Sequence, residues 1–126
     1  MSIRTPIARV RGHGSARSGT THFWHQRVTA VANVFLVTAF VVILVSQLGR
    51  SHATVIQTLA SPFVAIVMLL MIGSVIYHMK LGMQVIIEDY VHDEKWKFAA
   101  IFANIFFAIL VAAGCVYSLL KISSGV

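Results

Sequence analysis

A histidine and an acid–tyrosine pair lie on one expected helix in the middle of this chain. His78 lies in a long apolar run, and Asp89 and Tyr90 follow at the polar end of that run. At ~100° and ~1.5 Å per residue, His78 and Asp89 lie about 20° apart around a helix and ~16 Å apart along it. The spacing therefore predicts one helix that holds an imidazole deep in the apolar region and a carboxylate and a phenol at its end.

Ionisable side chains inside an apolar span are rare and usually mark a site. One interpretation of His78 is an axial ligand of haem, because neutral imidazole suits iron and a helix holds it rigidly. Gly82, one turn away, would then leave room for a porphyrin. The other interpretation is a histidine that only hydrogen-bonds a neighbouring helix, and the pattern alone leaves both open.

The remaining histidines lie at span ends or in polar segments: His13, His22, His25, His52 and His92. A haem held by two histidines would therefore take its second ligand from another subunit.

The acidic end of the same helix also has two interpretations. Carboxylates at a helix carboxyl end oppose the helix dipole, and such broken local rules often mark functional places. Asp89 and Tyr90 fit a quinone headgroup site, where tyrosine donates a hydrogen bond and a carboxylate helps to deliver protons. The alternative is a solvated acidic loop beside an interfacial tyrosine.

A basic and aromatic cluster opens the first apolar run. Arg27 either snorkels to the membrane surface, with Trp24 as an interfacial anchor, or holds an anionic group such as the propionates of a haem. Each interpretation is compatible with the spacing.

Composition places these residues in a membrane protein. Of the 126 residues, 58% are hydrophobic and only 11% are charged, whereas soluble domains carry about 25% charged residues. The net charge of +6 does not indicate nucleic-acid binding. Five of the chain's arginines gather before or at the start of the first apolar run with no acid among them, which is an orientation signal. They are Arg4, Arg9, Arg11, Arg17 and Arg27.

The sequence predicts an all-α membrane protein with three transmembrane helices. Residues 1–21 form a flexible, basic cytoplasmic head, and residues 22–126 form the anchor domain. Its spans cover about 23–48, 62–87 and 96–120, each long enough for a ~30 Å hydrocarbon core. A short segment lies along the interface before the second span, and a charged loop covers 88–97.

Two local signals complete this outline. Ser61 and Pro62 predict a helix start with a hydroxyl cap. Three spans together with the positive-inside rule place the amino terminus and the loop after Tyr90 in the cytoplasm.

Taken together, these residues resemble a known family. Asp-Tyr eleven and twelve positions after His78, and the Gly-Thr-x-His-Phe-Trp-x-Gln-Arg-x-Thr-Ala block at 19–30, are similar to the small hydrophobic membrane-anchor subunit of bacterial succinate dehydrogenase. The resemblance runs from about Ser18 to the end of the chain.

The resemblance implies a non-catalytic anchor in the bacterial inner membrane. It implies a partner anchor of the cytochrome b556 type, with an iron–sulfur subunit and a flavoprotein docked on the pair to oxidise succinate. It further implies that haem b lies between the two anchors with His78 as an axial ligand of its iron. Tyr90 would contact ubiquinone beside Asp89, and Arg27 and His22 would contact the haem propionates.

Two alternatives remain at this point: the anchor of a fumarate-reducing relative, and a small three-span channel or pore without a cofactor. A channel has no need of a deep histidine above an acid–tyrosine pair.

Overall fold

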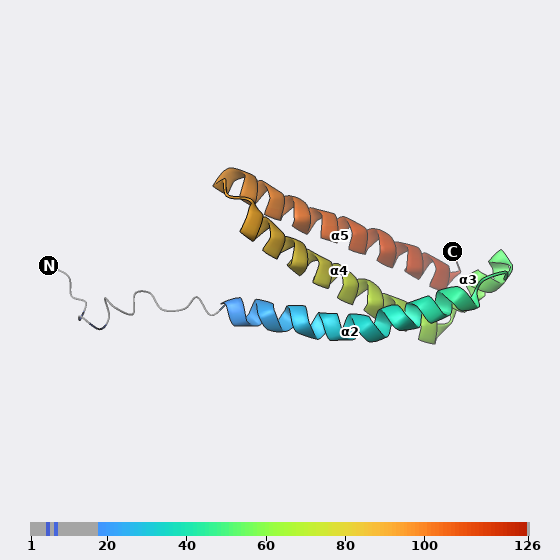
Figure 1. The fold of residues 1–126 in the computed structure, drawn as a ribbon. Helices are drawn as coiled ribbons and strands as arrows, with labels where there is room; N and C mark the ends of the chain where they lie inside the picture. The colour runs from blue at the N-terminus through green and yellow to red at the C-terminus, as the bar shows by residue number, and fades with distance from the viewer. Residues whose placement is uncertain (1–4, 6, 8–17, 126) are drawn as a thin grey trace.

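The computed structural model describes residues 5, 7 and 18–125, and four helices follow one another in residues 18–125. Three are long: α2 (Ser18–Ser46), α4 (Pro62–Tyr90) and α5 (Glu94–Ser124). The short α3 (His52–Ala60) joins α2 to α4 (Figure 1). Each long helix is apolar enough to cross a membrane. The predicted class, an all-α protein with three candidate spans, is therefore confirmed, and α3 occupies the place of the predicted interfacial segment.

The central element is α4. Both α2 and α5 pack along it, whereas within the described residues no Cα atom of α2 lies within 8 Å of one of α5 (Figure 1). The three long helices thus form a single layer, with α3 against α5 and α4 at one end. Few side chains are buried in this arrangement: Ala65, Leu81, Ile87, Asn104, Ala108 and Leu119.

The long helices extend further than the predicted spans. α2 begins at Ser18, so residues 18–21 of the predicted head are helical, and the rest of that head (1–4, 6 and 8–17, with four of its arginines) lies outside the described residues. The predicted bounds of the charged loop, 88–97, are wrong. Because α4 continues as far as Tyr90 and α5 starts at Glu94, only residues 91–93 connect the two helices.

Capping explains this short connection. The Asp93 carboxylate accepts a hydrogen bond from the Trp96 backbone N–H at 3.1 Å and so starts α5. The Lys97 ammonium donates to the Glu88 carbonyl at 3.2 Å, which satisfies one of the free carbonyls at the end of α4. Two short polar bonds therefore hold a tight turn between two long helices.

Ser61 and Pro62 begin α4 as predicted, with proline in the first turn. The predicted hydroxyl cap is wrong, however, because Ser61 makes no side-chain cap bond to α4. Its hydroxyl instead donates to the Thr58 carbonyl at 2.7 Å and satisfies the end of α3. The side chain of Ser61 thus caps the helix that it follows, while its backbone carbonyl accepts from the Ala65 N–H of the helix that it precedes.

Candidate functional site

Polar side chains gather on α2 along its contact with α4. His22, Gln26, Thr29 and Asn33 recur at helical spacing, and each is partly shielded from solvent. Residues three and four apart lie on one face of a helix. The rest of the span is largely apolar and exposed. α2 therefore presents a polar stripe to the face of α4 that carries the predicted site residue His78.

Thr29 and His78 meet across this contact. Thr29 Oγ1 lies 3.0 Å from His78 Nδ1, and the same hydroxyl lies 2.7 Å from the His25 carbonyl. A threonine hydroxyl has one proton. We assign that proton to the His25 carbonyl, the shorter of the two contacts, so that Thr29 Oγ1 accepts from His78 Nδ1.

This assignment sets the tautomer of His78. With its proton on Nδ1 and donated to Thr29, the neutral ring carries a lone pair on Nε2. Metal-ligating histidines usually donate their other ring N–H in this way, which fixes both the ring orientation and the tautomer. In this tautomer the lone pair lies on Nε2, and the residue that sets it belongs to a different helix.

Gly82 lies at the contact between α4 and α2. A Cβ added at Gly82 would lie 3.3 Å from Gln26 Nε2, so the space above this glycine faces a side chain of α2. That Gly82 leaves room for a porphyrin stays a prediction. The missing side chain lets the Gln26 amide lie close against α4.

The two predicted propionate contacts lie in different surroundings. His22 lines a groove between α2 and α4, and its Nε2 atom is buried with no hydrogen-bond partner among the described residues. Arg27 is exposed, and its guanidinium carbon lies 4.3 Å above the centre of the Phe23 ring. Phe23 in turn packs edge-on against Trp24. The structure therefore holds Arg27 in place by a cation–π contact.

A second pair joins the same two helices near His78. The Tyr77 hydroxyl lies 2.7 Å from His25 Nδ1. This pair and the Thr29–His78 pair are formed by neighbouring residues of α4. Two polar contacts therefore fix how α2 sits against α4 at this level of the membrane.

Asp89 and Tyr90 form the end of α4, about 16 to 18 Å along the helix from His78. Tyr90 is 77% exposed. Neither side chain forms a hydrogen bond within the described part of the chain, whereas the neighbouring Glu88 carboxylate accepts one from Gln84 at 2.8 Å. Asp89 and Tyr90 are thus both available for contacts from outside this chain.

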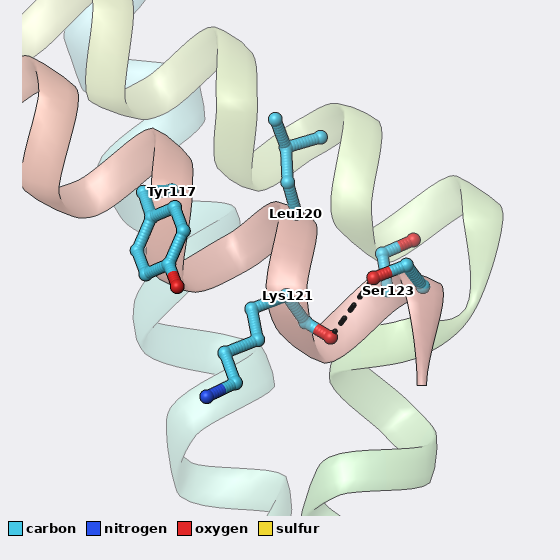
Figure 2. Close-up of a pocket in the computed structure, with 5 residues that line it drawn as sticks. Tyr117, Leu120, Lys121 and Ser123 are labelled. Atoms are coloured by element: carbon cyan, nitrogen blue, oxygen red, sulfur yellow. Dashed lines mark hydrogen bonds between the residues drawn. The ribbon is translucent and has the colours of Figure 1, made fainter. Parts of the chain in front are cut away.

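A hollow of about 540 Å³ lies elsewhere, at the C-terminal end of α5 (Figure 2). Tyr117, Leu120 and Lys121 line it, and the Ser124 hydroxyl donates to the Lys121 carbonyl at 3.2 Å. This end of α5 is opposite to the end that adjoins Tyr90. The hollow has no histidine or acid in its lining and plays no part in the site described above.

Neither Thr29 nor the His25–Tyr77 pair was predicted from the sequence. The usable signal is the spacing of His22, Gln26, Thr29 and Asn33, which is helical and polar within an apolar span. Such a stripe predicts a face that packs on protein and not on lipid.

Comparison with known proteins assigns the family. The family model for the succinate dehydrogenase/fumarate reductase transmembrane subunit matches residues 1–112. The chain belongs to this family. Its similarity to a succinate dehydrogenase hydrophobic membrane anchor subunit of Paracoccus denitrificans is 32% identity over 99% of this chain and 96% of the relative.

Other relatives give the same family name. An anchor subunit of the same description from Rickettsia bellii is 32% identical over 86% of each chain. The succinate dehydrogenase membrane anchor subunit of Reclinomonas americana is 41% identical over 68% of this chain and 74% of its own length. No solved structure gives a significant match.

The succinate dehydrogenase membrane anchor is a non-catalytic subunit, and its three apolar helices fit a multi-pass membrane protein. The resemblance drawn from the sequence is thereby confirmed. A channel or pore without a cofactor gains no support from these relatives.

Proposed function

We propose that this anchor pairs with a second anchor subunit of the cytochrome b556 type to hold haem b and to form part of a ubiquinone site. The pair docks the iron–sulfur and flavoprotein subunits on the cytoplasmic face of the bacterial inner membrane. The observation that carries the proposal is the contact between Thr29 and His78, which leaves His78 Nε2 as a lone-pair donor.

The chain's own residues fit a haem. His78 would supply one ligand of the iron from α4, and Thr29 would keep its ring in the required tautomer. The second ligand comes from the partner anchor. Arg27, held over Phe23, and His22, whose buried Nε2 lacks a partner, supply donors for the propionates. When bound, the haem supplies one-electron redox chemistry between the two anchors.

Ubiquinone binds at the other end of α4 in this proposal. The Tyr90 hydroxyl donates a hydrogen bond to a quinone carbonyl, and the adjacent Asp89 carboxylate holds a proton near the same oxygen. Because Tyr90 is 77% exposed in this chain, other subunits must enclose the quinone. The docked iron–sulfur subunit and the partner anchor supply those walls, and succinate oxidation in the flavoprotein supplies the electrons.

The visible absorption spectrum of the purified complex tests the proposal. His78→Ala removes the proposed ligand, so the spectrum of low-spin haem b should be lost or changed. His52→Ala is the matched control, because His52 is exposed at the start of α3. An unchanged low-spin spectrum in His78→Ala would show that this histidine only packs against Thr29.

A further inference from the structure

A polar groove of about 360 Å³ lies between α2 and α4, a size within the ~300–1,000 Å³ of small-molecule sites. All but one of its lining side chains are polar, and none is acidic; Leu81 is the exception. The polar residues are Thr21, His22, His25, Tyr77, Lys80 and Gln84. The groove therefore presents hydrogen-bond donors and one permanent positive charge.

The positive charge of this groove belongs to Lys80. Its side chain is half-buried, and among the described residues its ammonium forms no ion pair or hydrogen bond. The uncharged stretch 63–79 that precedes it covers ~25 Å of helix, close to the ~30 Å of a hydrocarbon core. Lys80 thus lies near the boundary between the hydrocarbon and the headgroups, where binding an anion stabilises an unpaired ammonium.

The His25–Tyr77 pair adds a donor to the same groove. The pair has one phenolic proton and, for neutral histidine, one ring proton, and a single proton is used in the 2.7 Å bond between them. If tyrosine donates, His25 Nε2–H remains free; if histidine donates, the tyrosine O–H remains free. In both cases one donor is left for a ligand.

An apolar groove continues from the polar one into the membrane. Tyr77 and Lys80 line both grooves, and the rest of the second groove lies between α4 and α5. Its small residues are Gly73, Ala108 and Ala112, with Ile76 and Ile109 beside them. A Cβ added at Gly73 would meet nothing within 4 Å, so this part of the groove is open.

The direction of this second groove is set by a bond between α4 and α5. The Asn104 side-chain amide donates to the Lys80 carbonyl at 2.9 Å, which places Asn104 level with Lys80. Ala108 and Ala112 follow Asn104 along α5 and therefore lie deeper in the membrane than Lys80. A cationic, donor-rich hollow at the headgroup level thus leads into an apolar hollow at acyl-chain depth.

We propose that this double groove binds one anionic phospholipid of the leaflet that faces the amino terminus. The phosphate lies against Lys80 and the free donor of the His25–Tyr77 pair, and one acyl chain fills the groove beside Gly73. The cationic groove matches the charge of a phosphate, and the apolar groove below it matches an acyl chain. This combination favours a lipid over a soluble anion. Neither the proposed haem ligand His78 nor Tyr90 lines the groove, whereas His22, a proposed propionate contact, does line it.

The test uses the intact membrane complex, exchanged into phosphatidylcholine and titrated with phosphatidylglycerol, with native mass spectrometry to count retained lipids. Wild type should retain one phosphatidylglycerol more per copy of this chain than Lys80→Gln does. The apparent affinity should fall about fivefold or more in that variant, since each lysine near an anionic surface is worth about that factor. Lys121→Gln is the control, because Lys121 is exposed at the opposite end of the protein.

A second pair of variants tests the acyl-chain groove without touching the charge. Gly73→Leu should displace the lipid, whereas Gly114→Leu should not, although neither glycine has an atom within 4 Å of an added Cβ. The proposal is overturned if wild type shows no preference for phosphatidylglycerol over phosphatidylcholine. It is also overturned if inorganic phosphate displaces the lipid at equal concentration, or if Lys80→Gln keeps the preference, as expected when an acidic residue of another subunit covers Lys80.

Discussion

Replacing Thr29 with valine removes a hydroxyl and keeps the shape of the side chain, so it tests the bond to His78 separately from the packing of α2 on α4. The Oγ1–Nδ1 distance is 3.0 Å. A neutral hydrogen bond contributes ~0.5–1.5 kcal/mol net, and a buried donor left unpaired costs ~1–3 kcal/mol. Thr29→Val leaves the His78 Nδ1–H in that unpaired state.

The expected readout is the midpoint potential of the proposed haem. A ligand imidazole that donates its N–H is more basic toward iron and favours the ferric state. If about 1 kcal/mol of this bond differs between the two oxidation states, the potential rises by roughly 40 mV in Thr29→Val, because ~59 mV is a tenfold change for one electron. A redox titration of the haem absorption in the purified complex measures this shift.

Thr38→Val is the matched control on the same helix. Thr38 is exposed, and its hydroxyl bonds only to the Val34 carbonyl of α2, at 2.5 Å. Thr29→Ser restores the hydroxyl and should restore the potential. Equal potentials in Thr29→Val and Thr38→Val would refute the role of Thr29 as the residue that positions His78.

Two further predictions concern the polar end of α4 and the orientation of the chain. Tyr90→Phe should lower quinone reduction by roughly tenfold or more, since the hydrogen bond strengthens as charge develops on the quinone oxygen and ~1.4 kcal/mol corresponds to tenfold. Succinate oxidation with an artificial acceptor and the haem spectrum should survive. A reporter fused after Val126 should lie outside the cytoplasm, and one inserted after His92, which leaves the Asp93 cap intact, should lie inside.

If Tyr90→Phe reduces quinone at the wild-type rate, Tyr90 is an interfacial aromatic residue without a role in the quinone site. Trp96→Phe is the control for that experiment, because Trp96 is 73% exposed near the same end of the membrane. Reporters on the same side of the membrane would contradict an odd number of spans.

The fold followed from composition because apolar helices of this length have one common environment. The ends of the helices did not follow so well. The acids after Ile87 indicated a loop, but Asp93 caps α5 and Lys97 binds the last turn of α4, so the helices continue almost to each other. Such caps depend on which side chain turns toward which backbone group, and composition does not contain that information.

Candidate site residues could be predicted from the sequence where a single residue is unusual for its surroundings. His78 was predicted because it is ionisable within an apolar run, and Asp89 because its carboxylate opposes the helix dipole, with Tyr90 beside it. Thr29 was missed because a threonine in a span usually bonds its own helix, as Thr29 also does with the His25 carbonyl. Its second bond, to His78, depends on the register of α2 against α4, as does the contact between Gly82 and Gln26.

The single layer of long helices has a consequence for the stability of the chain against degradation in the cell. Because, among the described residues, no Cα atom of α2 lies within 8 Å of one of α5, both faces of the layer of helices are open to lipid or to a partner subunit. A partner that binds these faces in place of lipid stabilises the folded chain. Stability then follows the concentration of the binding partner, as in any linked equilibrium. Copies made in excess of their partner should therefore be the first to be degraded, which would keep the subunits of the membrane complex in fixed proportion.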